Sequence, residues 1–77
     1  MERKPSFVYY VIYDHPRDYP NHWVMRPWFG FENGDIVPAL GCILGATLED
    51  VRAWVPPTHT NLGNVYETDP TIYEVWI

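Results

Sequence analysis

The chain has 77 residues, of which 47% are hydrophobic and 17% aromatic, and its formal net charge is −5. This length allows one domain with a thin core, because a domain of this size hides only about 60% of the surface that its unfolded chain exposes. Ten acidic against five basic residues leave no basic stripe, so we expect no direct binding to nucleic acid. The aromatic content argues against intrinsic disorder.

Cysteine content and hydropathy predict the compartment. Cys42 is the only cysteine, which excludes an internal disulfide and favours a reducing compartment. Its neighbours are apolar, so we expect a small buried role for it and no catalysis. The start, MERKPSF, lacks the apolar run of a signal peptide, and the longest apolar stretch, FVYYVIY, is far shorter than the ~20 residues of a membrane helix. We therefore expect a cytoplasmic protein without membrane association.

Two strands are predicted in the first third of the chain. Residues 7–13 are β-branched or aromatic throughout and apolar on both faces, which indicates a central strand that is covered on both sides. Residues 22–29 indicate a second strand, with a free edge near Pro27 because proline cannot donate a ladder hydrogen bond. The loop of about eight residues between them joins an antiparallel pair.

The middle of the chain predicts a turn and a helix. Asn33-Gly34 is a signal for a type I′ hairpin that would pair Phe31 with Ile36, and a brief strand over 42–44 follows. Thr47 is a suitable N-cap for a helix of about two and a half turns, which the prolines after residue 55 end. Its predicted apolar stripe consists of Leu48, Val51 and Val55, with Trp54 beside them.

Residues 71–77 predict a final strand, which we expect to lie beside the first. Strict alternation places Ile72, Glu74 and Trp76 on one face. A carboxylate among apolar neighbours requires a partner, for which Arg26 and Arg52 are the candidates.

These elements predict one α+β domain over residues 1–77, with residues 1–5 flexible. It would be an antiparallel sheet of three to four strands in the order β-β-(β)-α-β, with one short helix packed on one face.

The stretch YDHPRDYPNHW, residues 13–23, holds the only candidate metal ligands that lie close together in sequence. Histidine and carboxylate are legitimate ligands, but the spacing matches no established motif, and prolines and turn-forming residues favour a rigid connecting loop. His59 is more simply explained as exposed. We expect no cofactor and, because no nucleophile–base pair can be placed, no enzymatic activity. The candidate ligands are Asp14, His15, Asp18, His22 and His59.

One short helix covers one face of a sheet that is apolar on both. We therefore expect a non-enzymatic interaction domain that forms a homodimer through its aromatic sheet face, with any further protein partner unknown. Two alternatives remain: a small-ligand or metal-binding protein that uses the loop 14–22, and an acidic protein that binds a basic partner. The residues expected in the homodimer interface are Tyr10, Ile12, Trp28, Tyr73 and Trp76.

The segments VIYDHPRDYPNHWVMRPW, LEDVRAWVPP and DPTIYEVWI, in this order, resemble small bacterial proteins of unknown function. The resemblance covers about half of the chain. It implies a compact bacterial domain and no particular activity, ligand or site residue.

Overall fold

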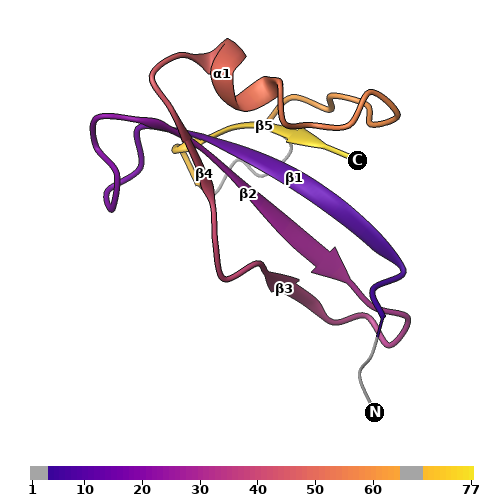
Figure 1. Ribbon diagram of the computed structural model, residues 1–77. Coiled ribbons are helices and arrows are strands. Elements are labelled where there is room, and N and C mark those ends of the chain that lie inside the picture. Colours follow the sequence, from indigo (N-terminus) through magenta and orange to yellow (C-terminus); the bar gives the residue numbers. More distant parts are fainter. Residues whose placement is uncertain (1–3, 65–68) are drawn as a thin grey trace.

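The computed structural model describes residues 4–64 and 69–77, and it shows an antiparallel sheet of five strands with one short helix on one face (Figure 1). The α+β class is confirmed, although the sheet has one strand more than the upper expectation. Of the residues expected to be flexible, 1–3 lie outside the described part. The elements are β1 (Phe7–Asp14), β2 (Trp23–Gly30), β3 (Ile36–Pro38), β4 (Ile43–Gly45), α1 (Leu48–Arg52) and β5 (Ile72–Trp76).

Strand β1 is central, as its two apolar faces predict. It pairs with β2 over its whole length and with β5 on its other side, both antiparallel. The strand order is β3-β2-β1-β5, and β4 also pairs with β2. The final strand therefore lies beside the first, as expected, and residues 15–22 form the loop between β1 and β2.

The outer edge of β2 is shared by two short partners. β4 pairs with Trp23–Met25 and β3 pairs with Trp28–Gly30, so the pairing is interrupted at Arg26 and Pro27. The interruption falls where proline offers no N–H, as the sequence predicts. The carbonyl of Pro27 instead accepts a bond from the Ala39 amide, at 2.8 Å.

The turn before β3 differs from the prediction. Gly34 has a φ of 94°, but Asn33 is not among the described residues with positive φ, so the turn is not type I′. The Asn33 side chain instead accepts the Asp35 amide, at 3.1 Å, which holds a type I turn followed by a glycine bulge. The extra residue shifts the register, and Ile36 pairs with Gly30 rather than with Phe31.

Helix α1 is shorter than predicted, with five residues, although its start is correct. Thr47 accepts the Asp50 amide and Asp50 accepts the Thr47 amide, which forms a capping box. After Arg52 the chain tightens into turns in which Val55 donates to the carbonyl of Arg52, at 3.0 Å. The predicted stripe is nevertheless directed at the sheet, because these turns keep Val55 on the same side as Val51.

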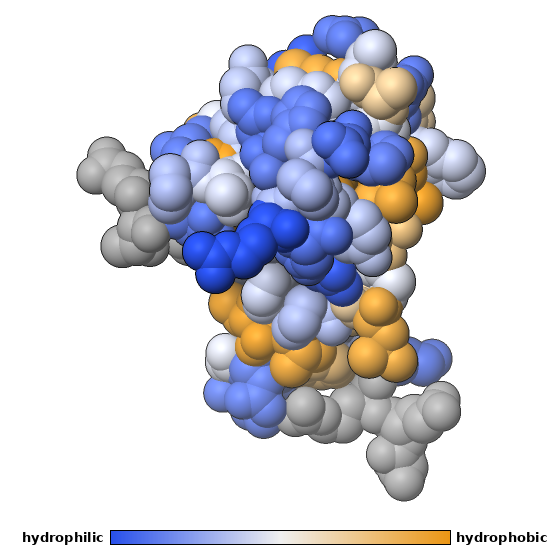
Figure 2. All heavy atoms as spheres, turned by 90° about the vertical axis from the view of Figure 1, so that its left-hand side faces the viewer, coloured by the Kyte–Doolittle hydropathy of each residue, from blue (hydrophilic) through white to orange (hydrophobic). Residues whose placement is uncertain are grey.

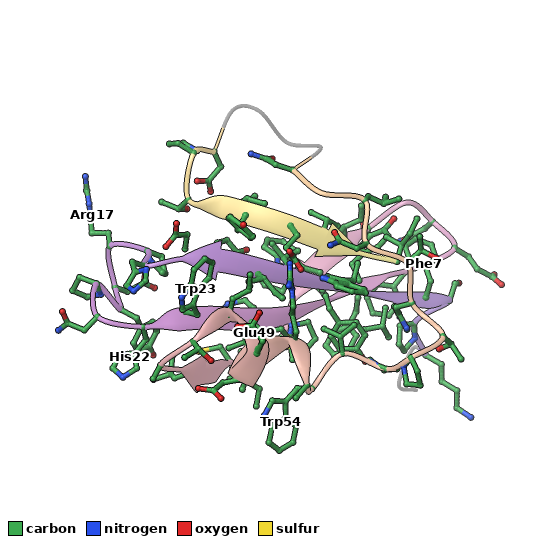
Figure 3. All side chains as sticks on the ribbon, turned by 90° about the horizontal axis from the view of Figure 1, so that it is seen from above. Phe7, Arg17, His22, Trp23, Glu49 and Trp54 are labelled. Atoms are coloured by element: carbon green, nitrogen blue, oxygen red, sulfur yellow. The ribbon has the colours of Figure 1, made fainter. Side chains whose placement is uncertain are left out.

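The core lies between α1 and the sheet, on the side that we call the helix face. Ile12, Met25 and Val51 are its buried centre. Trp54 lies outside it, 63% exposed, and points away from the sheet (Figure 3). The partly buried residues around this centre are Tyr10, Trp23, Ile43, Leu48, Val55 and Trp76.

A bulge in β5 overturns the predicted alternation. Ile12 pairs with Glu74 and Tyr13 pairs with Ile72, which leaves Tyr73 without a partner in register. Tyr73 consequently lies on the helix face, where its ring meets that of Trp23 at 5.0 Å between centroids. Ile72 moves to the opposite face. Glu74 and Trp76 still share one face, as the alternation predicts, and that face is the helix face.

The outer edge of β5 is covered by the segment that follows α1. The backbones of Thr60 and Ile77 exchange two hydrogen bonds, at 2.6 and 3.0 Å, and the Leu62 amide donates to Val75, at 2.8 Å. This segment is polar and contains glycine, so its sequence gives no strand signal. It acts as a short irregular strand because these backbone groups find partners at the edge.

Candidate functional site

The face of the sheet opposite α1, which we call the open face, carries an apolar hollow. This apolar hollow has a volume of about 320 Å³. Its side chains come from the central strand and both of its neighbours, because alternate residues of paired strands point to the same side. The lining residues are Tyr9, Val11, Tyr13, Trp28, Ile36, Asp69, Ile72 and Val75.

The floor of the apolar hollow is buried and its surroundings are exposed. Val11 is 5% exposed and Val75 2%, whereas the large apolar side chains of the same face, Phe7, Ile36 and Leu44, remain between 43 and 49% exposed. Among these, Phe7 lies across Gly30 so closely that a Cβ atom there would come within 1.9 Å of the ring. Figure 2 shows exposed apolar residues below the middle of the molecule, on the side away from α1, and along one flank.

A second hollow of about 290 Å³, the polar hollow, adjoins the first. Tyr13 and Asp69 line both hollows, so they form the boundary between them. The additional lining residues of the polar hollow are Pro16, Arg17, Asp18, Tyr19, Val24, Arg26 and Thr71.

Tyr13 at this boundary remains a neutral phenol. Burial is the main reason that its pKa is raised; the hydrogen bond from Trp28 and the positive charge of Arg26 oppose this, while the charges of Asp69 and Asp18 add to it. The indole Nε1–H of Trp28 donates to the Tyr13 hydroxyl oxygen, at 3.2 Å. The hydroxyl proton of Tyr13 is therefore retained at neutral pH and can serve as a donor.

Arg26 and Asp69 are held in place by neutral groups. Arg26 donates through Nη1 to the Ala39 carbonyl, at 2.7 Å, across the interruption in the edge of β2. Asp69 accepts the amide and the hydroxyl of Thr71 through one oxygen, Oδ1, at 2.9 and 2.6 Å. Within residues 4–64 and 69–77, no carboxylate forms an ion pair with Arg26 inside 4.0 Å. The open face thus carries charges of both signs that are not paired with one another there.

On the helix face, Glu74 finds one of its two predicted partners, Arg52. Arg52 donates to both carboxylate oxygens, through Nη2 and, at 3.0 Å, through Nε, and the indole of Trp76 adds a bond of 2.6 Å. Burial alone would raise the pKa of Glu74, but these hydrogen bonds, one from Asn61 and the charge of Arg52 outweigh it and hold the pKa below its usual value. Both oxygens of the Glu74 carboxylate accept hydrogen bonds, so its ion pair with Arg52 has a structural role.

The candidate metal ligands do not converge. Asp14 and His15 contact each other, and the His15 ring packs edge-on against Trp23 at 5.5 Å. His22 points outward (Figure 3), and Asp18 lines the polar hollow. In the part of the chain that the structure describes, no three His, Cys, Asp or Glu side chains are placed to hold a metal ion.

His59 lies far from the loop 14–22 and is less exposed than expected. Its Nε2–H donates to the carbonyl of Val8, at 3.1 Å, and its ring meets Tyr10 edge-on at 4.8 Å. Val8 is near the start of β1 and the loop follows its end, so about 20 Å of strand separates them. The expectation of an exposed, solvated His59 is therefore wrong.

The five predicted interface residues are divided between the two faces. Tyr10, Ile12 and Trp76 belong to the core beneath α1, and Ile12 has no exposed surface. Tyr73 also lies on the helix face, and only Trp28 lies on the open face. These five residues do not form one surface, because the sequence did not reveal which face the helix takes.

Cys42 and Leu44 differ from what the sequence indicates. Cys42 is only partly buried rather than enclosed, and its thiol lies beside the Tyr19 hydroxyl, whose pKa this contact raises. Leu44 is opposite Val24 in the register and is 43% exposed on the open face. The signal for this surface in the sequence is that β1 is apolar on both faces, but among the described residues the expected cover on both sides is absent: α1 covers only the helix face.

The comparisons with protein families, with curated proteins and with solved structures found no match. Among the described residues, no helix is long and apolar enough to cross a membrane.

Proposed function

We propose that this chain is a small non-enzymatic interaction domain that pairs with a second copy of itself through the open face. The observation that carries the proposal is the set of large apolar side chains exposed on this face. Phe7, Ile36 and Leu44 are 44, 49 and 43% exposed, and they lie on the same face as the apolar hollow, on the side that α1 does not cover. Exposed apolar surface of this kind is typical of contact surfaces.

The charges of the open face favour a second copy over a partner of opposite charge. Although the chain carries a net charge of −5, the charged residues that line the two hollows balance: Arg17 and Arg26 against Asp18 and Asp69. Two open faces can therefore meet without bringing net like charge together. A two-fold arrangement places the same patch on both sides, so the tyrosine and tryptophan rings of one copy meet those of the other.

Light scattering at micromolar concentration tests the proposal. The expected mass is twice the 9.1 kDa of one chain. Phe7→Glu places a charge on the open face and is expected to weaken the association at least about tenfold, because the charge would have to be desolvated. Trp54→Glu is the matched control: it adds the same charge at an exposed aromatic residue on the other side of the sheet and should leave the mass unchanged.

Leu44→Glu repeats the test at a different strand, in case Phe7→Glu unfolds the domain. A wild-type protein that stays monomeric overturns the proposal. A dimer that Trp54→Glu dissociates, but that Phe7→Glu and Leu44→Glu leave intact, overturns it as well. The two alternatives named from the sequence, a ligand or metal held by the loop 14–22 and a basic partner for the acidic chain, stay predictions. No group of metal ligands in the described structure favours the metal form.

A further inference from the structure

The two hollows of the open face are adjacent and chemically different. They share Tyr13 and Asp69, and their volumes of about 320 and 290 Å³ are near the lower end of the roughly 300–1,000 Å³ of ligand sites. An occupant that spans them must therefore be a small molecule. This inference goes beyond the proposed self-association, because it concerns a site within a single chain.

The apolar hollow favours an apolar group of a ligand. Its floor is Val11 and Val75, both almost fully buried, and the rings of Tyr9 and Trp28 form part of its wall. Aromatic walls and a dry aliphatic floor bind a ring or a branched alkyl group by removing both surfaces from water. Among the described residues, the one carboxylate that lines this hollow is that of Asp69, which together with Tyr13 also lines the polar hollow.

The polar hollow selects a group that carries both charges. Arg26 supplies a cation whose only hydrogen bond to another described residue goes to a neutral carbonyl, and Asp69 supplies an anion whose Oδ2 takes no part in its two bonds to Thr71. A purely anionic ligand such as a nucleotide would meet the repulsion of Asp18 and Asp69. A purely cationic ligand would meet Arg17 and Arg26.

We propose that the two hollows form one binding site for a free amino acid with a large apolar side chain. Its carboxylate pairs with Arg26 and its ammonium group with Asp69, while its side chain occupies the apolar hollow against Trp28. Tyr13, at the boundary, donates its hydroxyl proton to the ligand carboxylate. Charge-assisted hydrogen bonds of this kind are about twice as strong as neutral ones, so both ends of the ligand contribute to recognition.

Calorimetric titration of the full chain with L-phenylalanine and L-leucine tests the site, and two analogues dissect it. N-acetyl-L-phenylalanine lacks the ammonium charge and 2-phenylethylamine lacks the carboxylate, so each is expected to bind at least about tenfold more weakly than L-phenylalanine. Arg26→Gln and Asp69→Asn should each produce a similar loss; Asp69→Asn keeps the oxygen that accepts from Thr71. The control is Glu32→Gln, because Glu32 is an exposed carboxylate outside both hollows. This variant should bind L-phenylalanine as tightly as the wild type does.

The outcomes separate this inference from the proposed function. The titration is repeated with the Phe7→Glu variant, since Phe7 lines neither hollow. Because the proposed dimer would cover both hollows, the site alone is overturned if neither the wild-type dimer nor the Phe7→Glu monomer binds either amino acid at millimolar concentration, whereas a wild-type monomer that binds L-phenylalanine overturns only the self-association. Equal binding of L-phenylalanine and both analogues also overturns the site, because the charges would then have no role. If Arg26→Gln unfolds the domain, the site is tested by two other losses of affinity: that of N-acetyl-L-phenylalanine for the wild type and that of L-phenylalanine for Asp69→Asn.

Discussion

The ion pair between Arg52 and Glu74 leads to an asymmetric prediction. The Glu74 side chain is 3% exposed, whereas that of Arg52 is 36% exposed. Replacement of Arg52 by methionine leaves a buried carboxylate without its counter-charge, which costs about 3 kcal/mol, the lower end of the range for a broken buried pair. Replacement of Glu74 by glutamine leaves a cation that water reaches, and the amide oxygen still accepts from Trp76, so we expect a cost of about 1 kcal/mol.

The double variant sharpens this asymmetry. Arg52→Met combined with Glu74→Gln removes both charges and leaves a neutral, hydrogen-bonded amide, so it should be more stable than Arg52→Met alone. Urea unfolding followed by tryptophan fluorescence at pH 7 gives the three free energies of unfolding. If Arg52→Met costs no more than Glu74→Gln, or the double variant is the least stable, the burial argument is wrong.

The same pair predicts opposite dependences on pH. In the wild type the pKa of Glu74 is below its unfolded value, so its contribution to stability is present above about pH 4.5 and is lost as the pH falls through the folded pKa. In Arg52→Met burial dominates and raises the folded pKa, so the folded state binds the extra proton and stability falls as the pH rises past about 4.5. Unfolding curves between pH 3 and 7 that change in the same direction for both proteins would refute this account.

Two further predictions concern the junction of β4 and α1. A Cβ atom at Gly45 would lie 2.8 Å from the side chain of Asp50 and 2.9 Å from that of buried Val51, so Gly45→Ala should lower the free energy of unfolding by about 1–3 kcal/mol. Gly41 has open space around it, so Gly41→Ala should change the free energy of unfolding by less than about 0.5 kcal/mol. Equal effects of the two substitutions would show that α1 shifts to make room for the added methyl group without loss of stability. Thr47→Ala removes the N-cap and should lower the free energy of unfolding by about 1 kcal/mol in the same urea assay. Thr47→Ser keeps the hydroxyl and should lower it much less. A Thr47→Ser variant as unstable as Thr47→Ala would contradict the role of the capping box.

The sequence predicts what depends on local chemistry. β-Branched and aromatic content correctly locates β1, the proline correctly marks the interruption of β2, and Thr47 correctly marks the start of α1. The type of turn at Asn33 escaped prediction because the side chain, by accepting the Asp35 amide, decides between two conformations that the same dipeptide permits.

What sequence periodicity could not reveal is how the strands fit together. A single bulge at Tyr73 reverses the predicted faces of Ile72 and Tyr73, and alternation alone contains no sign of it. The helix chooses the face that holds Tyr10 and Ile12 although the opposite face of β1 is equally apolar. The open face and its hollows follow from that choice, which is why four of the five residues predicted for one interface lie on the helix face and only Trp28 lies on the open face.

The margins of the sheet limit how the molecule can aggregate. On one side β2 is flanked by β3 and β4, each of three residues, with Pro38 closing β3; on the other, residues 60–63 occupy the border of β5. An incoming strand from another molecule finds no long row of free amides to extend. In the described part of the chain, growth into fibrils by edge-to-edge stacking is therefore disfavoured, and the proposed association through the open face would stop at two copies, because each copy has one such face.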